Sequence, residues 1–195
     1  MIKAKIESVY PNHFIKLKHG IESLYVADYT DQTNSKKGVI CQFKVSFNDI
    51  ECFNIINPTN LDIAWIPFNQ KSFKYPNGKP KSQCECVVFP YIGTKETWIL
   101  FSELKYSQNE LSNTSNINKA RKQLFKTRYY YYSSGIFQTT NLCYLIIALP
   151  KQKEPFANIS FTPSYLQNLK LKHNVILRAR NGIEIIDDKF LLVDS

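Results

Sequence analysis

The sequence lacks the signals that would place the chain in or across a membrane. It contains no apolar run near the roughly 20 residues that a membrane-spanning helix needs. Residues 1–7 mix apolar and charged side chains and contain no apolar signal-peptide core. We therefore expect a cytoplasmic protein with no membrane partner.

Paired cysteines and the common nucleotide-binding loops are also missing. The five cysteines are odd in number and include no C-x-x-C pair, so we expect reduced core thiols rather than disulfides or a zinc site. The three histidines show no metal-ligand spacing. The motifs G-x-x-x-x-G-K, G-x-G-x-x-G and G-x-S-x-G do not occur. The sequence therefore gives no support to a nucleotide-binding protein or a serine hydrolase.

Acidic residues are scarce in the second half of the chain. Between Asn116 and Arg180 the only acid is Glu154, against eleven lysines and arginines, and the whole chain has a net charge of +9. Such a one-sided segment suits a polyanionic partner, with nucleic acid first and an acidic membrane surface second. Solubility alone is the alternative explanation of this charge.

The length of 195 residues predicts a single domain over 1–195. Within it we distinguish a β-rich N-terminal part at about 1–75, a core at about 80–150 and a C-terminal β-hairpin at about 174–193. A chain of this size can bury roughly 70% of its unfolded surface, so it needs neither disulfides nor a metal to fold.

The N-terminal part is read mainly from short alternating patterns. They predict strands at 3–9, 14–18 and 39–47, and either a helix or a strand at 21–29. Polar, glycine and proline residues predict loops or turns at 31–38, 57–58, 66–67 and 75–80.

The core has sharper patterns. Strands are predicted at 84–91 and 98–106, joined by a hairpin connection at 93–96. Helical spacing of apolar residues predicts a helix at 116–131. The near-continuous apolar run at 142–149 is typical of a strand covered on both faces.

In the C-terminal part, the sequence predicts a short helix from Ser164 and then a hairpin. Residues 174–180 and 183–186 are apolar and alternating, and Asn181-Gly182 between them is a strong turn signal. A final strand is expected at 190–193.

Three charged residues fall where two core strands meet. Glu103 and Lys105 end the apolar run that begins at Trp98, and their spacing of two places them on one face of a strand. In an antiparallel hairpin, Glu85 at the start of one strand lies close to the end of the other. Two converging carboxylates suit a hard divalent cation such as Mg²⁺, and a lysine beside them can stabilise charge on a phosphate.

These segments resemble the PD-(D/E)xK nuclease superfamily, which has the restriction-endonuclease-like fold. Its core is a helix, three antiparallel strands, a helix and a further strand. Its first acid lies on the second core strand and its (D/E)xK motif on the third, which Glu85 and the run Glu103-Leu104-Lys105 match. Glu85 stands where the superfamily usually has aspartate. The resemblance covers roughly residues 80–150 and implies an α/β (α+β) fold, a mixed sheet flanked by helices, here with extra N-terminal strands and a C-terminal hairpin.

The resemblance implies a Mg²⁺-dependent DNA endonuclease, with Mn²⁺ able to substitute, acting in restriction, phage defence or mobile-element processing. Glu85 and Glu103 would hold the metal, and Lys105 would complete the catalytic set. Gln123 would be an auxiliary residue on the following helix. The residues expected to contact nucleic acid are basic: Lys119, Lys122, Lys126, Lys151 and Lys153.

Several alternatives stay open at this point. The domain could be a catalytically inactive nucleic-acid-binding or assembly module on the same fold, or an RNase. The Glu103–Lys105 pair could be a structural ion pair, and Gln123 or the two lysines of 151–153 could be ordinary surface residues. The resemblance allows a homodimer or a subunit of a larger complex.

Overall fold

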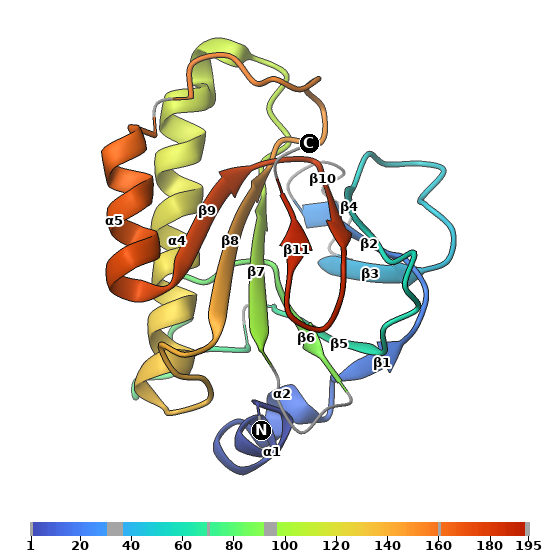
Figure 1. Ribbon diagram of the computed structural model, residues 1–195, viewed down its shortest axis with the longest axis vertical. Helices are drawn as coiled ribbons and strands as arrows, with labels where there is room; N and C mark the ends of the chain where they lie inside the picture. The colour runs from blue at the N-terminus through green and yellow to red at the C-terminus, as the bar shows by residue number, and fades with distance from the viewer. Residues whose placement is uncertain (1, 31–36, 70, 92–96, 160, 194–195) are drawn as a thin grey trace.

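The computed structural model describes residues 2–30, 37–69, 71–91, 97–159 and 161–193. Within these residues the protein is a mixed α/β structure of three layers (Figure 1). A six-stranded sheet forms the middle layer, helices cover one of its faces, and a five-stranded sheet packs on the other. We call these two faces the helix-side face and the sheet-side face.

The six-stranded sheet has the order β1-β5-β6-β7-β8-β9. Strands β1, β5, β6 and β7 are successively antiparallel, and β7, β8 and β9 are parallel. The bounds of these strands are β1 Lys18–Gly20, β5 Ile63–Pro67, β6 Cys86–Pro90, β7 Trp98–Leu104, β8 Leu142–Ala148 and β9 Val175–Ala179.

The five-stranded sheet has the order β11-β10-β4-β2-β3. It joins strands from both ends of the chain, because β10 pairs in parallel with β4. The bounds of these strands are β2 Leu24–Asp28, β3 Val39–Phe43, β4 Phe53–Ile56, β10 Gly182–Ile185 and β11 Leu191–Leu192.

Helices α4 and α5 lie against β7, β8 and β9. The N-terminal helices α1 and α2 lie together at the bottom of the view in Figure 1. Their bounds are α1 Ile2–Val9, α2 Pro11–Phe14, α4 Asn113–Ser133 and α5 Pro163–His173, with a short 3₁₀ helix at Glu110–Ser112 before α4. No helix of the described residues is both long and apolar enough to cross a bilayer.

Strand β7 shows why the central sheet needs apolar residues on both faces. Ile99 and Phe101 pack into the helix-side core, whereas Trp98, Leu100 and Leu104 pack into the core between the sheets. All seven residues of β7 and all seven of β8 are buried. The predicted strand at 142–149, covered on both faces, is confirmed, and so are the helices expected at 116–131 and from residue 164.

The predictions for the first 20 residues were wrong in part. Residues 2–9 form helix α1 rather than a strand, and residues 14–18 contribute the end of α2 and the first residue of β1. The sequence Ile-Lys-Ala-Lys-Ile fits a period of two, but only Ile2 and Ile6 are buried in α1. Their spacing of four places both on one face of a helix.

The predicted C-terminal hairpin was also wrong. Strand β9 extends the six-stranded sheet beside β8, while β10 belongs to the other sheet. The chain passes between the two layers at Arg180 and Asn181. The Asn181 side chain fixes this passage, since its Nδ2 donates to Leu149 O (3.0 Å) and its Oδ1 accepts from Leu149 N (2.8 Å). The hairpin of this region is β10–β11.

The presence of a second sheet also refines the prediction that helices flank the main sheet. Among the residues that the structure describes, helices flank one face of the main sheet and the five-stranded sheet covers the other. Residues 66–67, predicted as a turn, end strand β5, which pairs with β6. The hairpin connection at 93–96 lies outside the described residues, as does most of the loop predicted at 31–38.

Candidate functional site

A buried ion pair lies at the end of β7 on the helix-side face. Glu103 is two residues after Phe101 and four after Ile99, so it is on the same face of β7 as these two side chains, which pack beneath the helices. Its side chain is fully buried, and Lys105 is 7% exposed. Lys105 Nζ donates to Glu103 Oε1 at 2.5 Å. The spacing of two in the sequence therefore places both groups on one face, as predicted.

The backbone fixes the position of this pair. Lys105 N donates to Ala148 O (2.9 Å), which carries the parallel β7–β8 ladder one residue beyond β7. Removing two charges from water costs several kcal/mol per ion, and their attraction offsets this only when the geometry is good. A fully buried Glu–Lys pair is therefore weak evidence for stability alone, and a functional role is a reasonable hypothesis for it.

Glu85 lies beside this strand end but at a kink in its own strand. It precedes β6, in a bend; its N donates to Ser102 O (2.9 Å) and its O accepts from Phe68 N (2.7 Å). Cys84 packs in the helix-side core and Cys86 in the core between the sheets, although a regular strand would place both on one face. The regular alternation of side chains between the two faces of the sheet is therefore interrupted at Glu85.

The charge of Glu85 acts on groups of both faces of the sheet, because it raises the pKa of Cys84 in the helix-side core as well as that of Tyr106. Burial is the main cause that raises the pKa of Tyr106; the hydrogen bond with the Asp28 backbone lowers it, and the charges of Asp28, Cys52 and Glu85 raise it. The Tyr106 hydroxyl donates to Glu51 O (3.0 Å), toward the second sheet. A side-by-side placement of the Glu85 and Glu103 carboxylates on one face stays a prediction.

Cys84 is the neighbour of Glu103 that the sequence did not indicate. Burial raises the pKa of the Cys84 thiol well above its usual value, and the charge of Glu103 raises it further. The thiol is therefore neutral at physiological pH. The backbone of Cys84 is bonded directly to α4, because Cys84 N donates a hydrogen bond to Thr127 Oγ1 (2.8 Å).

Gln123 lies one turn before Thr127 and contacts the same segment. Its Nε2 donates to Gln83 O (3.0 Å), two residues ahead of Glu85. Its Oε1 is buried and accepts no hydrogen bond from the described residues. Gln123 therefore ties α4 to the segment before β6 that contains Glu85.

Replacing Thr127 with valine is expected to lower the free energy of unfolding by about 1–3 kcal/mol, because the buried N–H of Cys84 would lose its acceptor. The side-chain volume barely changes, so little cavity cost is added. Urea denaturation of Thr127→Val measures the effect. Thr114→Val, at an exposed site on the same helix, is the control, and a loss there as large as at Thr127 would contradict the explanation.

A pocket of about 250 Å³ opens beside Lys105. It is lined by Lys105, Tyr106 and Ser107 after β7, and by Asn116 and Lys119 from the first turns of α4. Asn116 and Lys119 are three residues apart, so they lie on one side of the helix. Lys119 was predicted to contact nucleic acid. Asn116 and Ser107 were missed, because nothing in their local pattern separates them from ordinary capping or loop residues.

Two buried amides hold the loop between β7 and α4. Gln152 Nε2 donates to Ser107 O (2.6 Å) and to Asn113 Oδ1 (2.8 Å), and Asn113 Nδ2 donates back to Gln152 Oε1 (2.8 Å). The segment after β8 is thereby joined to the start of α4. This bridge supports the rim of the Lys105 pocket, and no local sequence pattern indicates it.

The remaining predicted nucleic-acid contacts are distributed over the surface. Lys122, Lys126 and Lys153 are exposed and Lys151 is half-buried. None of these four lines the Lys105 pocket. Lys151 and Lys153 flank Gln152, which bonds to the loop after β7. The two lysines therefore lie at the same end of the sheet as the C-terminal ends of β7 and β8.

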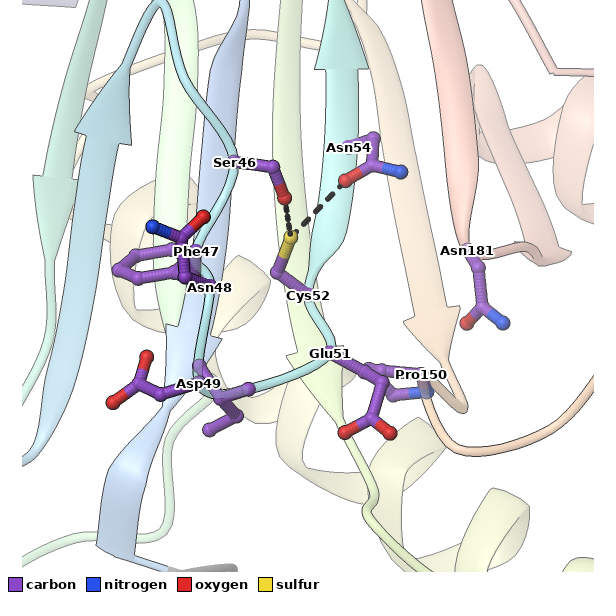
Figure 2. Close-up of a pocket in the computed structure, with 10 residues that line it drawn as sticks. Ser46, Phe47, Asn48, Asp49, Glu51, Cys52, Asn54, Pro150 and Asn181 are labelled. Atoms are coloured by element: carbon purple, nitrogen blue, oxygen red, sulfur yellow. Dashed lines mark hydrogen bonds between the residues drawn. The ribbon is translucent and has the colours of Figure 1, made fainter.

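A second and larger pocket, of about 520 Å³, lies beside the loop before β4, next to Pro150 and Asn181 (Figure 2). Figure 2 shows Cys52 at its wall, where the thiol donates to Asn54 Oδ1 (3.2 Å) and lies 3.3 Å from Ser46 Oγ. Burial raises the pKa of Cys52, so the thiol is neutral at physiological pH. None of the residues predicted from the sequence lines this pocket.

The part of the chain that the structure describes contains no group of three or more His, Cys, Asp or Glu side chains placed to hold a metal. The predicted set supplies two carboxylates, Glu103 of β7 and Glu85 just before β6. Mg²⁺ is commonly held by one or two carboxylates with water completing its shell, so these are donors of the kind that Mg²⁺ uses, and a Mg²⁺ site at this pair stays a prediction.

Comparison of the chain with models of protein families, with curated proteins and with solved structures finds no match in any of the three.

Proposed function

We propose that this protein hydrolyses phosphodiester bonds of DNA with the help of a divalent cation. The observation that carries the proposal is the buried Glu103–Lys105 pair at the edge of a pocket whose other wall is the basic helix α4. Lys119 lines the same pocket, so two lysines face one cavity. Such a cavity suits a phosphate group, and the buried carboxylate beside it suits a cation.

The order of elements supports this proposal. Helix α1, strands β5, β6 and β7, helix α4 and strand β8 occur in the order found in the core of PD-(D/E)xK nucleases, with α2 and β1 to β4 inserted after α1. Glu103 lies near the end of the third of these core strands, Lys105 directly follows that strand, and Glu85 directly precedes the second.

Glu103 and Glu85 would hold the cation, which when bound would polarise the phosphate and lower the pKa of an attacking water. Lys105 would stabilise negative charge that develops on the phosphate, since its ammonium is fixed by Glu103 and by the β7–β8 ladder. Gln123 Oε1 is a buried acceptor that can orient a water molecule. Lys119 would bind the neighbouring phosphate.

The test is cleavage of supercoiled plasmid with Mg²⁺, with Mn²⁺ and with EDTA. We expect cleavage only with a metal, and a rate at least about 100-fold lower for Lys105→Met, because a fixed charge at the reacting phosphate would be lost. The exposed Lys189→Met is the matched control and should cleave like the wild type. Single-stranded DNA and RNA are tested in parallel.

Absence of cleavage of all substrates by the wild-type protein, or equal cleavage by Lys105→Met, would refute the catalytic proposal. The second candidate is a non-catalytic nucleic-acid-binding module, and the complete burial of Glu103 is the observation that favours it. That candidate requires salt-dependent DNA binding in EDTA, unchanged by Glu103→Gln, with no metal-dependent turnover.

A further inference from the structure

We propose that a groove between α4 and α5 binds single-stranded nucleic acid. This inference rests on the proposed function and extends it, because it adds a second surface that contacts nucleic acid and specifies that the bound nucleic acid is single-stranded. The groove has a volume of about 420 Å³. Helix α4 contributes Arg121, Phe125 and Arg128, and α5 contributes Tyr165, Leu169 and His173. In Figure 1 the two helices lie next to each other on the outer side of the sheet.

Helical spacing gathers these side chains. The α4 residues are at i, i+4 and i+7, and the α5 residues are at i, i+4 and i+8, so each set forms one stripe along its helix. The two stripes face each other across the groove. The result is an aromatic and aliphatic floor between cationic side chains.

The cations of the groove are already placed against aromatic rings. The Arg121 guanidinium lies 5.7 Å from the centroid of the Tyr165 ring. Arg128 lies 5.2 Å from the Tyr132 ring, and its Nη2 donates to His173 O (3.4 Å). Holding these groups in place before binding lowers the entropy cost of engaging a ligand.

The charge around the groove selects an anion. Between Asn116 and Arg180 the only acidic residue is Glu154. It is engaged elsewhere, since its Oε2 accepts from Arg180 Nη1 at 2.7 Å. An anionic partner is therefore favoured over a cationic one.

The aromatic side chains distinguish a single strand from a duplex. Bases can stack on tyrosine, phenylalanine or arginine only when they are not already stacked inside a double helix. A duplex would meet the cations with its phosphates but could not place a base beside Tyr165. A groove that combines both kinds of side chain fits a single strand with at least one base inserted.

Helix α4 also connects the groove to the Lys105 pocket. At 100° per residue, Arg121 and Lys119 lie on opposite flanks of α4, 200° apart. Lys122 and Lys126 fall on the exposed arc between them. A strand leaving the pocket can thus cross α4 over lysines and enter the groove.

The experiment is fluorescence anisotropy of a labelled 12-nucleotide single-stranded DNA, and of a duplex of the same sequence, in EDTA. Tyr165→Leu keeps an apolar side chain in the groove but removes the stacking surface. We expect it to weaken single-strand binding roughly tenfold, with duplex binding unchanged. Arg121→Gln is expected to reduce the slope of log affinity against log salt by about 0.7. The controls are Tyr75→Leu and Lys44→Gln, two exposed residues outside the groove.

Equal loss of single-strand and duplex binding in Tyr165→Leu, or no loss in either variant, would overturn the groove proposal. Arg121→Gln changes only a half-buried surface side chain, so it tests the proposal even if Tyr165→Leu is unstable. Because binding is measured without metal, the outcome is separate from catalysis. A protein that cleaves plasmid but fails this test keeps its proposed function, and one that passes without cleaving keeps the groove.

Discussion

Lys105→Met is expected to lower the free energy of unfolding by about 3–5 kcal/mol, because it leaves the carboxylate of Glu103 buried without the ammonium that faces it. Methionine matches the lysine stem in length, so the loss reflects the charge rather than a cavity. Urea denaturation at neutral pH measures it. The size of this effect would identify the pair as a coupled unit, whatever its role in catalysis.

The double variant Glu103→Leu, Lys105→Met separates stability from chemistry. Replacing both partners of a buried ion pair by apolar residues of similar volume is often neutral or stabilising, so we expect the stability to return to near the wild-type value. Cleavage should stay absent. A pair kept only for stability would give the opposite pattern, with the double variant markedly less stable than the wild type. The surface pair of Lys44 and Glu22 is the control, where single replacements should cost less than about 1 kcal/mol.

Lowering the pH from 6.5 to 4 is expected to cost about 3 kcal/mol of stability at His13 alone. Burial lowers the pKa of His13 from 6.5 to about 4; the hydrogen bond to Ser72 raises it somewhat, and the charge of Lys16 lowers it. Between these values the unfolded chain binds a proton at His13 and the folded protein does not. The contribution of His13 to the free energy of unfolding is therefore fully present above pH 6.5. It falls as the pH decreases toward 4, by up to 1.36 kcal/mol per pH unit.

The environment of His13 explains why its imidazole stays neutral. Its Nε2 donates to Ser72 O (2.7 Å), so Nδ1 accepts from the Tyr131 hydroxyl (3.1 Å). The ring stacks on Tyr10 with centroids 4.7 Å apart. A second proton would place a positive charge on this buried ring.

The measurement is the unfolding free energy at several pH values between 4 and 7 for the wild type, His13→Gln and His173→Gln. We expect the His13 variant to lose most of the extra slope, while the exposed His173 variant keeps the slope of the wild type. Identical pH dependence of the wild type and His13→Gln would show that His13 titrates alike in both states.

Strong local patterns predicted the elements near the candidate site. The apolar runs at 98–104 and 142–148 are strands buried on both faces, and the helical spacing of Ile117, Ala120 and Leu124 marks the buried stripe of α4. The pairing of Glu103 with Lys105 follows from the period of two in a strand. Each of these features depends on residues close together in the chain.

Features that depend on distant partners were not predicted. Whether 2–9 is a helix or a strand depends on what covers Ile2 and Ile6, and the passage of the chain between the sheets at Asn181 depends on Leu149. The kink at Glu85 has the same origin, since the segment before it bonds to Thr127 and Gln123 of α4 instead of continuing the ladder. No local pattern contains these contacts.

The amino-acid sequence alone is enough to predict a buried strand that ends in a carboxylate and an amine, followed by a basic helix and a second buried strand. Periodicity and charge are properties of short segments, so they could be read directly. The folded structure is needed to show that a second sheet covers one face of the main sheet, that Asn116 and Lys119 line one pocket with Lys105, and that α5 lies beside α4 to form the groove. These arrangements are fixed by long-range burial and hydrogen bonds between segments that are far apart in the chain.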